Sequence, residues 1–457
     1  MNNKLATTLA TLLGPDRVST QRDDLLSHAV DAYGRWRAVE VAKPLAVVFA
    51  RTTEDVQKTL EFASQNGVPV VPYGGGTGVS GGATSITPGI VLSLRGLDRV
   101  HELDAEGLRA QVGPGMILED LVTAAEAKGA LFAHDPWSRP IASVGGSIAI
   151  NGVGYLAGKY GVMGEQVLGL EVVLPDGRVV ETRGVPKTAG PGLTPLFIGS
   201  EGTLGVITKA TVQLFPLPER RALAAYRFPG FEDGFLATLE MRRVGLAPAL
   251  VDFAEEPFSG EDGAVLYLGF DGPAEEVAAD EAIGRRICQA HRGALLPQKK
   301  VDHFWAHRHD SGWNYKREVL SQPPARRRRR PWRMDYLHIA LPASRVLEYH
   351  RLCREMVQRY EAPVHEWSLW GRPEYFSLIV ADPAPDGVAR SAALTAVADE
   401  MLRVANDMGG TMEYCHGVGL KLGGQMEREL GPAMTLLRDV KKALDPKGIM
   451  NPGKMGL

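Results

Sequence analysis

A glycine-rich segment near the start of the chain has the composition of an anion-binding loop. Residues 72–82 read Pro-Tyr-Gly-Gly-Gly-Thr-Gly-Val-Ser-Gly-Gly. Glycine reaches positive φ without strain, so several successive amide N–H groups can converge there on one phosphate group. A loop that binds nothing is the alternative, because glycine-rich segments also serve as plain turns.

Two better-known phosphate loops do not fit this segment. A Walker loop requires a lysine followed by serine or threonine, and residues 72–82 contain no lysine. The dinucleotide fingerprint matches as Gly76-x-Gly78-x-x-Gly81, but that fingerprint must open a helix. The apolar run that predicts the next strand begins at Ile90, which leaves no room for a helix. We therefore expect a phosphate site of another kind.

Two further glycine clusters follow. The second cluster reads Ser-Val-Gly-Gly-Ser-Ile-Ala-Ile-Asn-Gly at 143–152 and ends with Lys-Tyr-Gly at 159–161. The third cluster reads Phe-Ile-Gly-Ser-Glu-Gly-Thr-Leu-Gly-Val-Ile-Thr at 197–208. Either cluster alone is a weak signal. Three clusters in this order and at these spacings are a stronger signal.

The composition is that of an ordinary globular protein. The 457 residues are 44% hydrophobic and 23% charged, and the net charge is −3. A chain of this length usually divides into two domains, and this charge balance gives no reason to expect a nucleic-acid partner. The scattered cysteines Cys288, Cys353 and Cys415 fit a reducing cytoplasm, and no apolar run is long enough to span a membrane.

The hydrophobic pattern predicts a βαβ unit that carries the first glycine cluster. A strand is expected at 45–50, then a helix that begins at Thr52 with Asp55 in a capping box and ends at Gly67, then a strand at 68–72. Further strands are expected at 90–94, 100–103, 108–112, 171–174, 178–182 and 204–214, and helices at 118–127, 277–290, 345–360 and 392–408.

The composition of the sequence changes near Pro216-Leu-Pro218, where glycine becomes less frequent. We therefore expect a domain boundary there. The expected divisions are an N-terminal helical segment (1–42), a glycine-rich domain (43–216), a second domain (217–430) and a C-terminal segment that returns to the first domain (431–457).

Together the three clusters resemble those of the p-cresol methylhydroxylase/vanillyl-alcohol oxidase superfamily of FAD enzymes. The nearer relatives are the FAD-linked D-2-hydroxyacid dehydrogenases and the alkyl-dihydroxyacetonephosphate synthases, and the resemblance is strongest over residues 44–215. It implies an α+β fold. The glycine-rich domain would be a two-subdomain FAD-binding domain, and residues 217–430 would form an α/β cap domain with an antiparallel sheet.

The resemblance also implies which residues contact FAD. They are Pro72, Gly74, Gly75, Gly76, Thr77, Gly78, Ser80, Pro136, Ser143, Gly145, Gly146, Asn151, Gly161, Glu201, Gly205, Ile207 and Asn451. Some members attach the flavin covalently through a histidine of the first loop or a cysteine of the second, and neither loop contains such a residue here. We therefore expect FAD to be held non-covalently.

The resemblance assigns the chemistry to His416, because residues 412–419, Met-Glu-Tyr-Cys-His-Gly-Val-Gly, are similar to the element that carries the family's catalytic histidine. Oxidation of a 2-hydroxy acid needs a base for the hydroxyl proton while the hydride passes to flavin N5, and a histidine with an ordinary pKa of ~6.5 suits that role. Arg308, in Phe-Trp-Ala-His-Arg, and Arg333 are expected to bind the substrate carboxylate. The alternatives are a structural histidine and surface ion pairs.

The sequence departs from the dehydrogenases at their metal site. Many of them use a His-x₆-His pair together with a glutamate directly before the catalytic histidine. Cys415 stands at the glutamate position, and the region 365–371 lacks the histidine pair. We therefore predict no catalytic metal. His303 and His307 are spaced as metal ligands on a helix would be, but without a third ligand we expect them to line a pocket or a helix surface.

The predicted function is an FAD-dependent oxidoreductase that oxidises a small 2-hydroxy acid or related hydroxylated substrate. The alternatives are an alkyl-dihydroxyacetonephosphate-synthase-like flavoenzyme and an oxidase of another alcohol or phenol. The electron acceptor (oxygen, quinone or protein) and a homodimer are left open, and a cytoplasmic location with at most peripheral membrane contact is expected. The run Arg326–Arg330 is expected to be a solvated loop. The alternatives for this run are a lid, or a contact with a phosphate-bearing substrate, an acidic acceptor protein or anionic lipid.

Overall fold

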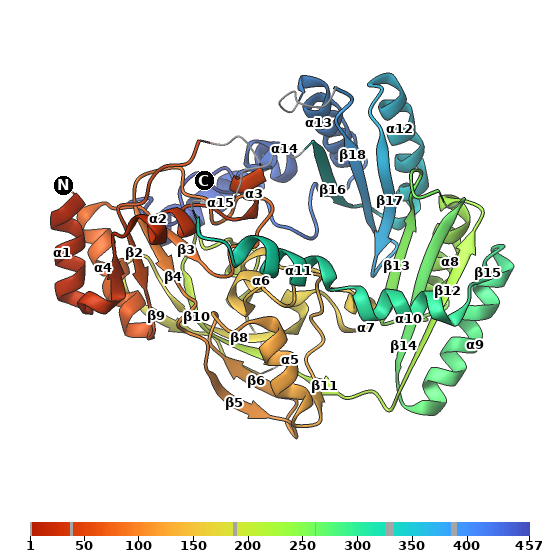
Figure 1. Cartoon of the computed structure of the whole chain (residues 1–457), viewed down its shortest axis with the longest axis horizontal. Coiled ribbons are helices and arrows are strands. Elements are labelled where there is room, and N and C mark those ends of the chain that lie inside the picture. Colours follow the sequence, from red (N-terminus) through yellow and green to blue (C-terminus); the bar gives the residue numbers. More distant parts are fainter. Residues whose placement is uncertain are drawn as a thin grey trace.

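The computed structural model describes residues 2–36, 40–185, 190–260, 262–324, 327, 333–384 and 391–457. The chain forms two lobes, each built on β-sheet with helices packed against it (Figure 1). This is the α+β class that the sequence predicts. In the described ranges, no helix combines the length and the apolar character needed to cross a lipid bilayer.

The first lobe contains a four-stranded sheet in the order β1-β2-β4-β3. Its strands are β1 (Val18–Ser19), β2 (Ala46–Phe49), β3 (Val70–Tyr73) and β4 (Ile90–Ser93), of which only β1 runs antiparallel to its neighbour. Helix α4 (Thr53–Asn66) begins with the predicted capping box and ends at Gly67 in the left-handed conformation. The βαβ unit is therefore confirmed. The segment 1–42 contains helices as well as the two-residue strand β1.

A five-stranded antiparallel sheet in the order β5-β6-β10-β8-β9 completes the first lobe. Its strands are β5 (Val100–Asp104), β6 (Arg109–Val112), β8 (Val167–Val173), β9 (Val179–Glu181) and β10 (Val206–Gln213). Helices α5 (Leu118–Glu126) and α6 (Val144–Ile150) share a core with this sheet through residues such as Leu121, Ile148 and Val212. Strands β7 (Ala130–Leu131) and β11 (Phe215–Pro216) pair separately.

The second lobe is a seven-stranded antiparallel sheet in the order β15-β12-β14-β13-β17-β18-β16. Its strands are β12 (Arg220–Phe228), β13 (Leu250–Glu255), β14 (Ala264–Gly272), β15 (Ala294–Leu295), β16 (Met334–Ala340), β17 (Val364–Trp370) and β18 (Tyr375–Ala381). Helices α8 (Phe231–Arg243), α9 (Ala274–Ala290), α12 (Val346–Arg359) and α13 (Ala392–Asp407) share one hydrophobic core with it. On β17, Trp367 and Leu369 belong to that core, so the alternating residues Glu366, Ser368 and Trp370 face the other way.

The remaining helices connect these elements and form the ends of the chain. They are α1 (Asn2–Leu13), α2 (Arg22–His28), α3 (Ala32–Trp36), α7 (Ala157–Tyr160), α10 (Gln298–His307), α11 (Asp310–Tyr315), α14 (Met426–Leu430) and α15 (Ala433–Leu444). Helices α10 and α11 run from the second lobe toward the first (Figure 1). After α15 the chain returns to the first lobe, where Met450 pairs with Val70.

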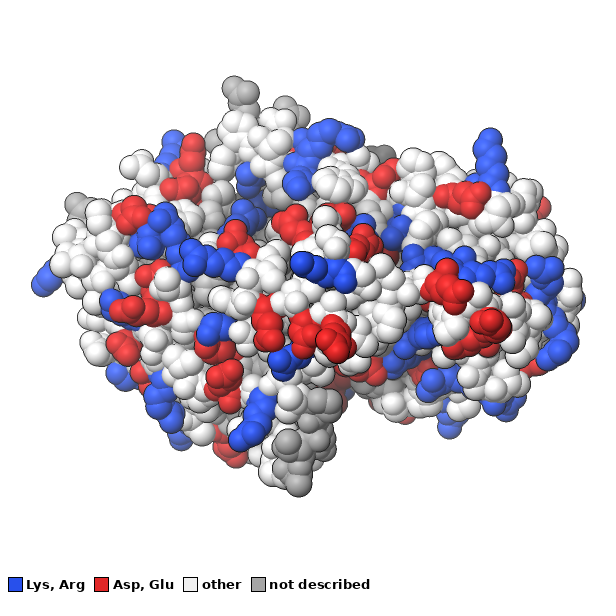
Figure 2. Space-filling view, turned by 90° about the horizontal axis from the view of Figure 1, so that it is seen from below, with Lys and Arg blue, Asp and Glu red and all other residues white. Residues whose placement is uncertain are grey.

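The predicted domain boundaries stay predictions, although strand membership does change between β11 and β12. On the face shown in Figure 2, basic and acidic side chains are interspersed. That face therefore carries no large area of a single sign.

Candidate functional site

One cavity in the first lobe brings the three glycine clusters together. Of the residues predicted to contact a cofactor, those that line it are Pro72, Gly74, Gly75, Gly76, Thr77, Gly78, Ser80, Pro136, Ser143, Gly145, Gly146, Glu201, Gly205 and Ile207. Cys415 and His416, from the far end of the chain, also line it. Clusters that are separated in the sequence therefore surround a single space, next to the histidine predicted to do the chemistry.

The glycines of this cavity let two backbone segments meet without side chains between them. A Cβ atom on Gly74 would lie 2.5 Å from Ser143 Oγ, and one on Gly75 would lie 2.5 Å from the carbonyl oxygen of Ile141. A Cβ atom on Gly145 would lie 2.5 Å from Pro114 Cβ. Since real Cβ contacts are longer than this, only glycine permits the first loop to pack against the second.

The second cluster contains the helix α6, which was not predicted from the sequence. Ser143 is the N-cap of α6, and its Oγ accepts a hydrogen bond from Gly146 N. The Ser-Val-Gly-Gly pattern contained the signal, because serine is a favoured N-cap residue, but two glycines in the first turn hid the helix.

Three predicted cofactor contacts lie behind the cavity wall instead of on its surface. Asn151 ends α6 in the left-handed conformation, and its Oδ1 accepts a hydrogen bond from Gly164 N at 2.8 Å. Gly161 packs against Glu165. Asn451 Nδ2 donates to the carbonyl oxygens of Gly82 and Glu201, at 2.8 and 2.7 Å. These residues support the wall, and their direct contact with the cofactor stays a prediction.

Several cavity residues are not among the predicted cofactor contacts, although Phe197 and Ser200 belong to the third glycine cluster. They are Asp31, His134, Trp137, Phe197 and Ser200. His134 and Trp137 flank Pro136, so their position beside a predicted contact was an available signal. Asp31 had none, because it lies about forty residues before the loop that it meets; its Oδ2 accepts a hydrogen bond from Ala83 N at 3.1 Å.

His416 sits on a turn that two buried carboxylates hold by its backbone. Glu413 Oε1 accepts hydrogen bonds from Cys415 N at 2.8 Å and from His416 N at 2.9 Å. Glu201 Oε1, from the third glycine cluster, accepts from Val418 N at 2.6 Å and Gly419 N at 3.0 Å. Burial raises the pKa of Glu413 and of Glu201 to about 7. The turn is thereby fixed both from its own chain segment and from the first lobe.

The imidazole of His416 is neutral across the physiological range. Burial, together with the charge of Lys421, lowers its pKa to about 3. Its ring meets that of His338 on β16, with centroids 4.4 Å apart. His338 Nδ1 lies 2.7 Å from Ser377 Oγ, which in turn lies 2.6 Å from Tyr414 Oη. The turn therefore rests on the polar face of the second-lobe sheet.

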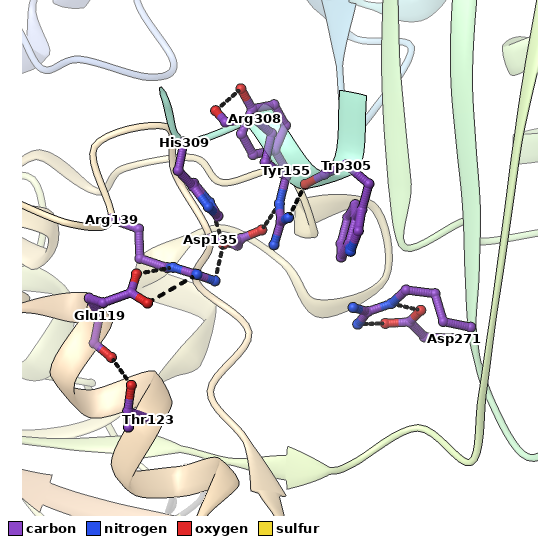
Figure 3. Close-up of polar contacts among 10 residues, drawn as sticks. Glu119, Thr123, Asp135, Arg139, Tyr155, Asp271, Trp305, Arg308 and His309 are labelled. Carbon is purple, nitrogen blue, oxygen red and sulfur yellow. Dashed lines mark hydrogen bonds and ion pairs between the residues drawn. The ribbon is translucent and has the colours of Figure 1, made fainter. Parts of the chain in front are cut away.

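Arg308 is not among the residues that line the cavity, so its expected role as a substrate clamp stays a prediction. Its Nε donates to Asp135 Oδ2 at 2.9 Å, and its guanidinium stacks 3.6 Å from the ring centroid of Trp305 (Figure 3). Asp135 also accepts from Arg139 Nη1 at 2.8 Å, and His309 Nε2 lies 2.8 Å from it. Arg308 thus ties the α10–α11 connection to the first lobe, directly behind the wall residues His134 and Pro136.

Arg333 also lies outside the set of cavity residues. It precedes β16, donates to the carbonyl oxygen of Ala384 and lies 3.9 Å from Asp382 Oδ1. Arg327 is the member of the predicted arginine run that the structure describes, and it donates to the carbonyl oxygens of Gln322 and Leu320. Arg326 and Arg328–Arg330 lie outside the described residues. In the described part of the chain, no three His, Cys, Asp or Glu side chains are grouped as metal ligands.

Replacing Asp135 with asparagine should lower the free energy of unfolding by about 3–5 kcal/mol, because two arginines would lose a buried counter-charge. Asp135 and Arg308 have side chains only 3% and 11% exposed, so solvent screens the pair weakly. Although burial raises the pKa of Asp135, the hydrogen bond from His309 and the charges of Arg308 and Arg139 hold it well below the usual range.

Urea denaturation checks this prediction, with the exposed Asp310→Asn as the matched control. Since the pKa of Asp135 is depressed, its contribution is present at neutral pH and is lost only as the pH falls through that depressed value. The gap between wild type and Asp135→Asn should therefore persist at mildly acidic pH and close in strong acid. Equal stabilities of Asp135→Asn and Asp310→Asn would contradict it.

Comparison with known proteins agrees with this geometry. A model of the FAD binding domain matches residues 44–183, and a model of the C-terminal domain of FAD linked oxidases matches residues 217–455. The chain is 29% identical to glycolate oxidase subunit GlcD of Bacillus subtilis, over 98% of this chain and 95% of that protein. It is 32% identical to a D-lactate dehydrogenase of Archaeoglobus fulgidus, over 92% of this chain and 93% of that protein.

The fold matches a solved structure as well. The structure of p-cresol methylhydroxylase with substrate bound aligns with a TM-score of 0.74 at 19% identity, covering 100% of this chain and 96% of that one. The FAD-binding fold expected from the glycine clusters is thus confirmed. The chain belongs to the FAD-linked oxidoreductases of the D-lactate dehydrogenase/glycolate oxidase type.

Proposed function

We propose that the chain holds FAD non-covalently in the glycine-lined cavity and oxidises a small 2-hydroxy acid or related hydroxylated substrate there. The observation that carries this proposal is that His416 lines the same cavity as the three glycine clusters. The cavity also fits FAD chemically. Gly74, Gly75 and Gly145 let the first loop and the second cluster pack together and put bare backbone on the cavity lining, and bare backbone is what a pyrophosphate and a flat ring system need at close approach.

In this proposal His416 is the base for the substrate hydroxyl. In the protein without substrate, burial lowers its pKa to about 3 instead of the ordinary value expected from the sequence, so the imidazole is unprotonated at neutral pH. Glu413 and Glu201 hold the backbone of its turn, so the ring does not have to be ordered when substrate binds. Bound FAD supplies the hydride acceptor. Arg308 and Arg333 stay the proposed partners of the substrate carboxylate; in the structure Arg308 meets Asp135 and Arg333 meets the carbonyl oxygen of Ala384.

The test is anaerobic reduction of the purified yellow protein. We expect D-lactate or glycolate to bleach the flavin absorbance near its long-wavelength band, and L-lactate to do so much more slowly. Bleaching by a simple alcohol or a phenol alone would overturn the hydroxy-acid substrate and favour the oxidase alternative. If the protein is yellow and no hydroxy acid, alcohol or phenol bleaches its flavin absorbance, the result would favour the non-redox, synthase-like alternative.

The remaining expectations stay predictions from the sequence. They concern the electron acceptor, a homodimer, the absence of a catalytic metal, and a cytoplasmic location with at most peripheral membrane contact. Absorbance of the reduced protein on admission of air would separate oxygen from a quinone or protein acceptor.

A further inference from the structure

Arg95 holds the first glycine loop from outside the cavity. It follows β4, and its side chain reaches back along the loop to two successive carbonyl groups. Arg95 Nε donates to the carbonyl oxygen of Gly74 at 2.9 Å, and Arg95 Nη2 donates to that of Gly75 at 2.7 Å. Arg95 itself does not line the cavity, whereas both glycines do. The guanidinium group therefore binds the loop through these two carbonyl groups, on the side that faces away from the cavity.

This pair of hydrogen bonds fixes which way the loop amides point. In a trans peptide the C=O and the following N–H lie on opposite sides of the chain, and the described chain contains no cis peptide. With the carbonyls of Gly74 and Gly75 turned toward Arg95, the N–H groups of Gly75 and Gly76 turn away from it. Because Gly74, Gly75 and Gly76 line the cavity and Arg95 does not, the side of the loop that faces away from Arg95 is the side of the cavity. Gly76 follows with φ of +68°, a change of sign that lets successive amides converge on one anion.

A loop with three consecutive glycines needs such a tether. Glycine loses more conformational entropy than any other residue when it is ordered, so an untethered loop would sample many arrangements of its amides. An arginine fork with two parallel donors orders two peptide planes at once, which a lysine cannot do. Tyr73 gives support from a second side, because a Cβ atom on Gly76 would lie 2.0 Å from its hydroxyl oxygen.

The charge of Arg95 adds to the effect. Among the described residues, no carboxylate lies within ion-pair distance of the Arg95 guanidinium, which stands 5.8 Å from the ring centroid of Tyr73. This positive charge lies at the carbonyl side of the loop whose amides would meet a phosphate group.

We propose that Arg95 is a positioning residue for the cofactor: it presets the peptide planes of Gly74, Gly75 and Gly76 so that the loop amides receive the FAD pyrophosphate. This rests on the proposed placement of FAD in the cavity. Arg95 touches the loop and not the cofactor, so its effect is on affinity for ligands that carry the pyrophosphate group.

The experiment titrates apo-protein with FAD, followed by flavin fluorescence, and separately with ADP, which carries the pyrophosphate without the flavin, by calorimetry. The variants are Arg95→Ala and Arg95→Lys, with Arg351→Ala as a control that removes a surface arginine from α12. We expect Arg95→Ala to weaken FAD and ADP by a similar factor, about ten- to a hundredfold, which is the usual effect of hydrogen bonds to a charged group. Arg95→Lys should recover only part of the loss.

Thermal unfolding of the apo-proteins separates positioning from folding. Arg95 is exposed and tethers a loop, so the apo forms of all the variants should melt close to wild type. Wild-type affinity in Arg95→Ala would overturn the proposal. So would full recovery in Arg95→Lys, which would assign the whole effect to charge, or weaker FAD binding with unchanged ADP binding. Wild-type apo-protein that takes up no FAD would instead reject the proposed function, and the two failures are thus distinguishable.

Discussion

His416→Asn should remain yellow and lose flavin reduction, with a rate about 10²- to 10⁴-fold below wild type. Asparagine keeps a polar side chain of smaller size but cannot accept the hydroxyl proton. The turn should survive the change, because Glu413 and Glu201 hold it through backbone amides and not through the imidazole. The measurement is stopped-flow reduction under anaerobic conditions with the best hydroxy acid of the panel.

The control is His303→Asn, which removes an exposed histidine from α10. It should reduce at the wild-type rate. Because burial lowers the pKa of His416 to about 3, the wild-type rate should also show no loss through protonation of His416 between about pH 8 and pH 5. A His416→Asn protein that keeps its flavin and its rate would show that another group is the base. Loss of the flavin would show that His416 supports the cofactor.

The parts of the fold that follow from local sequence were predictable. The capping box of Thr52 and Asp55, the stop at Gly67 and the paired strands predicted at 171–174 and 178–182 all depend on residues that are near neighbours in the chain. The first cluster was recognisable for the same reason, since a run of glycines limits what the backbone can do. Its ligand, however, came from the resemblance and not from the loop alone.

The placement of the charged residues was not predictable, because their partners are distant in sequence. Arg308 was expected at the substrate, but its carboxylate partner Asp135 is 173 positions away. Glu201 was expected at the cofactor, and it does line the cavity, yet it also binds the turn of His416 from 217 positions away. Sequence shows that an arginine or a glutamate is present. Only tertiary packing decides which opposite charge or amide it meets.

Gly75→Ala should largely abolish retention of FAD. The new Cβ atom would lie 2.5 Å from the carbonyl oxygen of Ile141 and 3.5 Å from Ser143 N. A backbone oxygen cannot rotate out of the way as a side chain can, so the first loop would have to move away from the second cluster. That movement would widen the seam that both loops form around the cavity. It would also shift the Gly75 carbonyl away from Arg95, which it meets at 2.7 Å.

The expected cost of such overpacking is about 1–3 kcal/mol in the free energy of unfolding, and the ratio of flavin to protein absorbance after purification should fall to a small fraction of the wild-type value. Gly424→Ala is the matched control, because a Cβ atom there would meet nothing within 4 Å. It should keep both stability and flavin. If Gly75→Ala purified with a full complement of FAD, the close contact between the two clusters could not be what shapes the cofactor site. If Gly75→Ala bound FAD weakly but its apo-protein were as stable as wild type, the loss of FAD would come from a changed direction of the loop amides, where Arg95 is proposed to act.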